Sequence, residues 1–181
     1  MRINLKLRYI SMEVWDVYDK DRNRTGRTVI RGDAMADGEY HLVADIWIMN
    51  TKGEVLLQKR SMEKETGPGL WCCTGGAAIA GEDSAQAFIR EMTEELGVSP
   101  ELEHAEIAFS HTRRNYHKDI WFVRQDIPSN AFRLQKEEVE AVRWVTLEEL
   151  EQESKNPAVW WRLSYLDELL TFLKTKEKAG R

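Results

Sequence analysis

The sequence predicts one mixed α/β domain, and three observations support this prediction. Segments with alternating or continuous apolar residues, which are typical of β-strands, recur along the chain. Segments with apolar residues at 3.6-residue spacing, which are typical of helices, lie between and after them. No internal repeat, low-complexity tract or long linker divides the 181 residues, a length that suits a single domain.

The first part of the chain is predicted to be mainly β-structure. Residues 13–31 form a predicted hairpin in which EVWDVY and RTVIR flank the polar turn DKDRNRTG. A second predicted hairpin joins HLVADIWIM (41–49) to EVLLQKR (54–60) through the turn NTKG. The loop SMEKETGPG then leads into LWCCTGG, which is predicted to be one short apolar strand ending in two glycines.

The clearest helix signal follows. Asp83 with Gln86 forms a capping-box pattern, and Gly97 supplies the stop. Five apolar residues fall on one stripe that should face the core: Ala85, Phe88, Ile89, Met92 and Leu96. Three glutamates project from another side of the same helix: Glu91, Glu94 and Glu95.

The rest of the chain continues the mixed pattern. Further strands are predicted at about 104–111, 119–125 and 138–145. Thr146 with Glu149 repeats the capping-box pattern and predicts a short helix. A final helix is predicted from Asn156-Pro157, an N-cap with proline at the first helical position. Its apolar positions are Trp160, Leu163, Leu166, Leu170 and Leu173.

Composition limits the partners and the compartment. A net charge of −5 gives no basic excess to neutralise phosphates, so nucleic acid is not expected as the main partner. No window approaches the roughly 20 apolar residues of a membrane span, and the N-terminus lacks the apolar core of a signal peptide. Cys72 and Cys73 are adjacent and should be reduced thiols on a buried strand. We therefore expect a cytoplasmic protein without membrane contact.

The three helical glutamates carry the functional signal. Like charges one turn apart destabilise an isolated helix by a few tenths of a kcal/mol, so their clustering needs a reason. A solvated acidic face is one reason. The alternative is a cation site, because the helix follows Gly75-Gly76, where the backbone can approach a ligand closely, and includes Arg90, which can bind a carboxylate bidentately. Carboxylates and a backbone carbonyl are the hard oxygen ligands that Mg²⁺ prefers.

The segment GAAIAGEDSAQAFIREMTEELGV (76–98) resembles the Nudix box over its full length. A chance match at its seven fixed positions has a probability on the order of 10⁻⁸ per window, from average residue usage. The fixed positions are Gly76, Glu82, Arg90-Glu91, Glu94-Glu95 and Gly97.

The resemblance implies a Nudix hydrolase with an α/β/α sandwich, a mixed β-sheet and a loop–helix–loop catalytic motif. Members hydrolyse a diphosphate bond in a nucleoside diphosphate linked to another moiety, and they use Mg²⁺ or Mn²⁺. The substrate would be a small phosphorylated molecule, and a homodimer is compatible with the family. The implied Nudix domain covers residues 13–175, with an N-terminal extension at 1–12 and a C-terminal tail at 176–181.

The resemblance also implies roles for individual residues. The implied metal ligands are Glu91, Glu94, Glu95 and the Gly75 carbonyl. The implied catalytic residues are Glu91, Arg90, Glu94 and Glu138. Arg90 would orient a glutamate, and the general base is either Glu91 or Glu138. Residues that support the box are Gly76, Glu82 and Gly97, of which Glu82 stabilises the loop or binds metal through water. Candidate substrate contacts are Arg60, Lys64 and Trp71.

The flanking segments EVWDVYDKDRNRTG, QKRSMEKETGPGLW and VEAVRWVTLEEL resemble the Nudix branch related to isopentenyl-diphosphate isomerase. In those isomerases a catalytic Cys stands directly before the box glycine and a His directly after it, where this chain has Gly75 and Ala77. Of two upstream metal-binding histidines, one matches His41 and the other falls at Ala34. The pattern therefore disfavours an isomerase. A further alternative is a catalytically inactive ligand sensor, but such proteins lose box glutamates, and this chain keeps them all.

Overall fold

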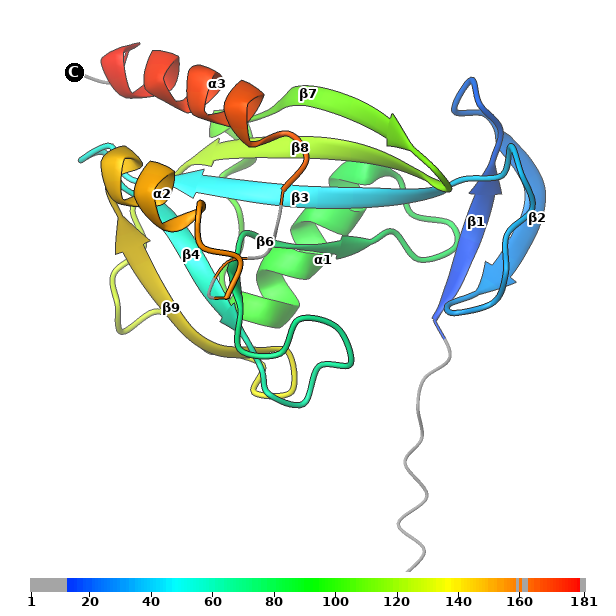
Figure 1. The fold of residues 1–181 in the computed structure, drawn as a ribbon, viewed down its shortest axis with the longest axis horizontal. Coiled ribbons are helices and arrows are strands. Elements are labelled where there is room, and N and C mark those ends of the chain that lie inside the picture. The colour runs from blue at the N-terminus through cyan, green and yellow to red at the C-terminus, as the bar shows by residue number, and fades with distance from the viewer. Residues whose placement is uncertain (1–12, 159, 161–162, 180–181) are drawn as a thin grey trace, which may run out of the picture.

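The computed structural model describes residues 13–158, 160 and 163–179, so the predicted extension at 1–12 lies outside the described residues. A hairpin of β1 (Val14–Tyr18) and β2 (Arg24–Ile30) stands at one end of a larger sheet (Figure 1). The strands of the larger sheet are β3 (His41–Met49), β4 (Val55–Arg60), β5 (Trp71–Cys72), β6 (Thr74–Ala77), β7 (Ala105–Arg113), β8 (Tyr116–Arg124) and β9 (Val139–Val145). The helices are α1 (Ser84–Leu96), the 3₁₀ turn η1 (Leu102–His104), α2 (Leu147–Glu153) and α3 (Leu166–Ala179).

The larger sheet is mixed, and β3 is its centre. β3 and β8 run parallel along their whole length, from His41 opposite Tyr116 to Met49 opposite Arg124. The other strand pairs are antiparallel. The strand order is β5-β4-β3-β8-β7, with β6 paired to β3 and β9 paired to β4.

Alternation along β3 divides the core into two layers. Ile46 and Ile48 belong to the buried cluster that contains Phe88 and Met92 of α1. Side chains of the other parity, such as Trp47, belong to the cluster that includes α3 residues. In Figure 1, α1 and α3 lie on opposite sides of the sheet. The predicted α/β/α sandwich with a mixed sheet is therefore confirmed.

The two helices whose ends carry local capping signals, α1 and α2, have the predicted caps. Asp83 and Gln86 form the capping box of α1, and Gly97 ends it with a left-handed φ of 69°. Thr146 and Glu149 form the capping box of α2. Ile89, which the prediction placed on the core-facing stripe of α1, is only half-buried.

The expected hairpin at 41–60 is correct only at its turn. Met49 opposite Val55 is the register pair between β3 and β4. Beyond it, β6 takes the edge of β3, with Val43 opposite Ala77, so β4 pairs instead with β5 and β9. LWCCTGG is likewise not one strand, because β5 and β6 pair with different neighbours.

The predicted start of the final helix is wrong. α3 begins at Leu166 rather than at Asn156, and residues 157–158 form a turn. Trp160 is buried and makes a β-bridge with Trp71, although its N–H also donates to the Asn156 carbonyl at 3.0 Å, as in a single helical turn. The expected domain boundary at residue 175 lies inside α3, which ends at Ala179. None of the described helices is long and apolar enough to cross a membrane.

Candidate active site

One cavity of about 740 Å³ brings most of the predicted site residues together. Its walls include parts of β1, β3, β6 and α1 and the loops before β5 and β9. The predicted residues that line it are Arg60, Lys64, Gly75, Gly76, Arg90, Glu91, Glu94, Glu95 and Glu138. Of the other predicted residues, Glu82 and Gly97 support α1, and Trp71 lies elsewhere.

The α1 helix presents its glutamates unequally. Glu91 and Glu95 lie one turn apart and are 8% and 6% exposed, whereas the side chain of Glu94 is 54% exposed. Glu95 Oε2 accepts hydrogen bonds from Gln58 Nε2 at 2.9 Å and from the Gly75 backbone N–H at 3.4 Å. Two of the three carboxylates that α1 presents to the cavity are therefore buried, so a solvated acidic face does not account for them.

Burial shifts the titration of both buried carboxylates. It raises the pKa of Glu91 to about 7, although the charge and hydrogen bond of Arg90 act in the opposite direction. It raises the pKa of Glu95 to about 8, and the nearby charge of Glu91 adds to that increase. Two carboxylates that disfavour being charged together would be stabilised by a cation between or beside them.

Arg90 connects the helix to the loop before it. Its guanidinium donates to Glu82 at 2.9 and 3.1 Å, to Glu91 Oε1 at 2.8 Å and to the Ala77 carbonyl at 2.9 Å. Glu82 in turn accepts from the Ile79 N–H at 3.0 Å. This network fixes one oxygen of Glu91 and ties Glu82 to the loop before α1.

Two glycines allow the close approach of backbone and carboxylate. A Cβ at Gly76 would stand 2.2 Å from Glu91 Oε1. Gly75 has a φ of +148°, and a Cβ there would stand 2.2 Å from the Ala44 carbonyl oxygen. Any side chain at either position would displace the strand or the carboxylate.

The donor set fits a hard divalent cation. It consists of carboxylate oxygens, and Glu91 Oε2 and Glu95 Oε1 have no hydrogen-bond partner within the described part of the chain. The same part holds no ready-made group of three or more His, Cys, Asp or Glu ligands. The fit therefore rests on two buried carboxylates with available oxygens, and Glu94 lies beside them on the cavity wall.

A family model described as NUDIX domain matches residues 39–169, which is most of the chain. The chain belongs to the Nudix family.

Relatives agree with this assignment. An uncharacterized Nudix hydrolase of Listeria monocytogenes is 44% identical over 141 residues, covering 77% of this chain and 83% of that protein. An isopentenyl-diphosphate Delta-isomerase of Streptomyces avermitilis is 32% identical and covers 72% of this chain and 70% of that protein. Among solved structures, a protein from Deinococcus radiodurans superposes with a TM-score of 0.70 at 22% identity, covering 88% and 98% of the two chains. The last comparison supports the fold.

This Nudix domain has no cysteine directly before the box glycine, although Cys72, Cys73 and His41 all line the cavity. Cys72 and Cys73 are buried and free, and burial raises the pKa of Cys72 to about 12 and that of Cys73 well above its usual value. Cys73 Sγ contacts Tyr165 Oη at 3.9 Å within the core. His41 stacks on Trp15 with 4.2 Å between ring centroids.

The candidates outside the Nudix box have different surroundings. Glu138 lines the cavity and forms an ion pair with Lys64. Arg60 also lines the cavity and donates to the Thr66 carbonyl at 3.0 Å. Trp71, a predicted substrate contact, does not line this cavity, because its ring lies under the Arg143 guanidinium, 4.2 Å from the ring centroid.

The sequence prediction missed polar residues on distant strands that line the cavity or hold one of its carboxylates. Gln58, which binds Glu95, also accepts a hydrogen bond from Thr74 Oγ1 at 2.9 Å. Asp45 lines the cavity and accepts hydrogen bonds from Lys118 at 2.6 Å and Tyr165 at 2.5 Å. The available signal was a polar residue beside apolar neighbours in each strand, Asp45 between apolar residues of HLVADIWIM and Gln58 directly after the apolar run of VLLQKR.

Proposed function

We propose that this protein is a hydrolase that uses a divalent cation, Mg²⁺ or Mn²⁺, to cleave the diphosphate bond of a nucleoside diphosphate linked to another moiety. Membership of the Nudix family supports this function. The observation that carries it is the buried pair Glu91 and Glu95, with raised pKa values, on the wall of a cavity.

The cation would be held by Glu91, Glu94, Glu95 and the Gly75 carbonyl. These groups supply hard oxygen ligands and leave room for phosphate oxygens. When bound, Mg²⁺ would neutralise diphosphate charge and lower the pKa of a water molecule. We also propose that the protein is cytoplasmic, a location with which its two buried free thiols are compatible.

The chain's own groups would orient the reactants and accept a proton. Arg90 fixes Glu91 through Oε1, so Oε2 is the oxygen that would serve the cation and a water molecule bound to it, and Gln58 orients Glu95. Glu138 is already engaged by Lys64, so we assign the proton acceptor to Glu91. Such a group is typically worth about 10²–10⁴-fold in rate. Lys64 and Arg60 line the same cavity and would donate to phosphate oxygens.

A hydrolysis screen tests the proposal. Nucleoside triphosphates, nucleotide sugars, dinucleotides and isopentenyl diphosphate would be incubated with the protein and Mg²⁺, with coupled phosphate detection. We expect a Mg²⁺-dependent hit whose rate falls at least about 10²-fold in Glu95→Gln. The matched control is Glu148→Gln, because Glu148 lies in a similar EEL sequence on the exposed face of α2. Full activity in folded Glu95→Gln would refute the cation site, and ligand binding without turnover would indicate a sensor.

A further inference from the structure

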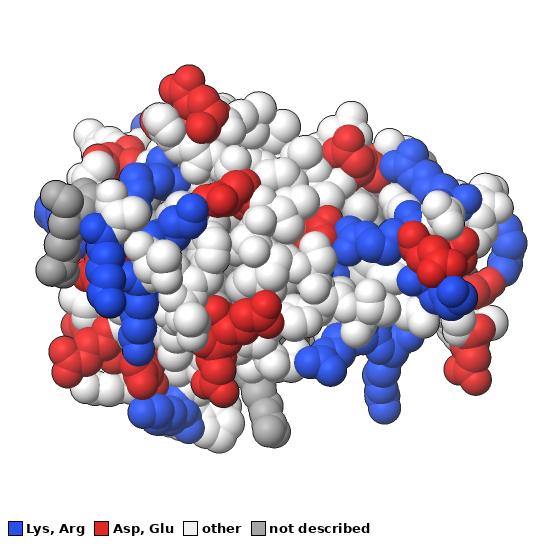
Figure 2. Space-filling view, turned by 90° about the horizontal axis from the view of Figure 1, so that it is seen from above, with Lys and Arg blue, Asp and Glu red and all other residues white. Residues whose placement is uncertain are grey.

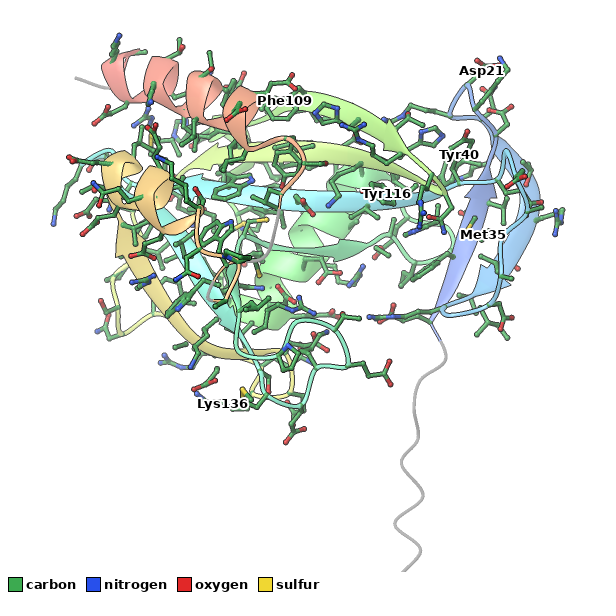
Figure 3. All side chains as sticks on the ribbon, in the orientation of Figure 1. Asp21, Met35, Tyr40, Phe109, Tyr116 and Lys136 are labelled. Carbon is green, nitrogen blue, oxygen red and sulfur yellow. The ribbon has the colours of Figure 1, made fainter. Side chains whose placement is uncertain are left out.

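The cavity has a second wall that the proposed hydrolysis does not use. Alternation along β3 places His41, Val43 and Asp45 on one face of the sheet. The parallel register sets Tyr116 beside His41 and Lys118 beside Val43. In Figure 1, α3 covers only one end of this face and the β1–β2 hairpin stands at the other end. Figure 3 shows Tyr116 toward the hairpin and Phe109 near α3, so this wall lies toward the hairpin.

Asp45 is fixed in place and keeps one acceptor oxygen. Lys118 Nζ donates to its Oδ2 at 2.6 Å, and Tyr165 Oη donates to the same oxygen at 2.5 Å. Within the described residues, Oδ1 has no hydrogen-bond partner. A bound group with a hydroxyl would therefore find a rigidly held acceptor beside an ammonium donor.

His41 and Trp15 carry buried polar atoms without partners. The His41 ring, in a residue that is 9% exposed, stacks on Trp15 at 4.2 Å with an interplanar angle of 12°. His41 Nδ1 and Trp15 Nε1 are both buried and have no hydrogen-bond partner among the residues that the structure describes. Leaving such a group unsatisfied costs about 1–3 kcal/mol, so a ligand that pairs with it gains affinity. Burial lowers the pKa of His41 to about 4, which keeps its ring neutral at physiological pH.

The charged residues on this side of the cavity form ion pairs with one another. Lys118 pairs with Asp45 at 2.6 Å, and Arg31 pairs with Glu13 at 2.9 Å. All four line the cavity. Figure 2 shows acidic and basic side chains interspersed on the face seen from above. The described part of this wall thus has no surplus positive charge to attract a further phosphate chain, but it offers hydrogen-bond groups and a stacked aromatic pair.

We propose that this wall, defined as Trp15, His41, Asp45 and Lys118, binds a neutral sugar, so that the substrate is a nucleoside diphosphate joined to a sugar. The inference rests on the proposed function and specifies the moiety beyond the diphosphate. Water would attack one phosphorus atom, the bridging P–O bond to it would break, and the bridging oxygen would leave with the other phosphoryl group. The products would be a nucleoside monophosphate and a sugar phosphate.

Binding of inert analogues by calorimetry tests the inference apart from turnover. The probes are α,β-methylene ADP-ribose against bis-methylene ATP, and α,β-methylene UDP-glucose against bis-methylene UTP, each with Mg²⁺. Within each pair the nucleoside is constant. A neutral sugar in one analogue stands where the other has its anionic terminal phosphate group. We expect the sugar analogue to bind at least about 5- to 10-fold more tightly in one or both pairs, the scale of one or two net hydrogen bonds.

Two variants separate recognition from a structural defect. Asp45→Asn leaves Lys118 without its charge partner, so affinity for the sugar analogue should fall and affinity for the triphosphate analogue should rise. His41→Phe keeps the stacking on Trp15 and removes Nδ1, so only sugar affinity should fall, by about 5-fold. The control is His104→Phe, because His104 is exposed and does not line the cavity.

Three results would overturn the inference. They are equal binding of the two analogues in wild type, equal loss of both in Asp45→Asn, and unchanged sugar affinity in folded His41→Phe. With hydrolysis intact, each would leave the proposed function standing. Absence of both binding and hydrolysis for every compound would instead refute the proposed function, and this inference with it.

Discussion

Glu95 lies one helical turn after Glu91 on α1, and the charge of Glu91 adds to the burial that raises the pKa of Glu95 to about 8. An arrangement of this kind destabilises the metal-free protein and becomes favourable when a cation binds. The predictions below follow from this pair and from the groups that hold it.

The metal-free protein should lose stability as pH rises, and Glu95→Gln should remove part of that loss. In the unfolded chain a glutamate has a pKa of about 4.3, whereas in the folded protein the pKa of Glu95 is about 8. Below about pH 4 both states are protonated and the carboxyl imposes no penalty. Between about pH 4.5 and 8 the folded state binds more protons, so the free energy of unfolding falls as pH rises.

Urea unfolding in EDTA at pH 5 and pH 8 measures this effect. We expect Glu95→Gln to be more stable than wild type by about 1–3 kcal/mol at pH 8 and nearly equal to it at pH 5. Glu148→Gln should match wild type at both pH values. A variant that is less stable than wild type at pH 8 would contradict the buried-carboxylate penalty.

Mg²⁺ should reverse the stability order of the same two proteins. A ligand that binds only the folded state stabilises it by about 2.7 kcal/mol at a concentration 100 times its Kd. A melting-temperature titration with MgCl₂ at pH 8 should therefore raise the Tm of wild type and leave that of Glu95→Gln nearly constant. Equal increases in both proteins would show that Mg²⁺ binds elsewhere.

The two candidate proton acceptors should respond differently to the same substitution. Glu91→Gln should lower kcat by at least about 10²-fold, because it removes the oriented carboxylate. Glu138→Gln should change kcat by less than about 10-fold, because Glu138 is engaged by Lys64. Steady-state kinetics of both variants on the substrate from the screen distinguishes them. The opposite ranking would assign the base to Glu138.

Gly76→Ala should inactivate the enzyme through Glu91. Its Cβ would stand 2.2 Å from Glu91 Oε1, so the carboxylate must move from the position that Arg90 fixes. We expect kcat/KM to fall at least about 10-fold, with little further loss when Gly76→Ala is added to Glu91→Gln. A double-variant cycle measures this coupling. Fully additive losses would mean that Gly76 acts independently of Glu91.

The elements that the sequence predicted well are those with local causes. α1 and α2 begin at capping boxes whose two members lie three residues apart, and α1 ends at a left-handed glycine. The start of the last helix was mispredicted, because the local signal at Asn156 caps only one turn, after which Trp160 bridges Trp71, far away in sequence, and α3 begins at Leu166. Tertiary pairing of that kind has no local signature.

The same distinction holds within the site. The Nudix box predicted the glutamates and Arg90, because their spacing is local and the helix brings them together. Gln58 reaches Glu95 from a strand 37 positions away, and Asp45 meets Tyr165 across 120 positions. Tertiary structure, and no local spacing, brings these partners together. Trp71 is the converse case, because it was predicted from a local segment, whereas in the fold its ring lies under Arg143 and does not line the cavity.

Hydrolysis in oxygen-18 water tests the central claim most directly. The protein would be incubated with the best substrate from the screen and Mg²⁺ in this water, and the masses of both phosphorylated products would be measured by mass spectrometry. The account predicts one oxygen-18 atom in one product, with formation that requires the divalent cation and is lost in Glu95→Gln. Products without the label, or labelled products formed at an undiminished rate by folded Glu95→Gln, would contradict it.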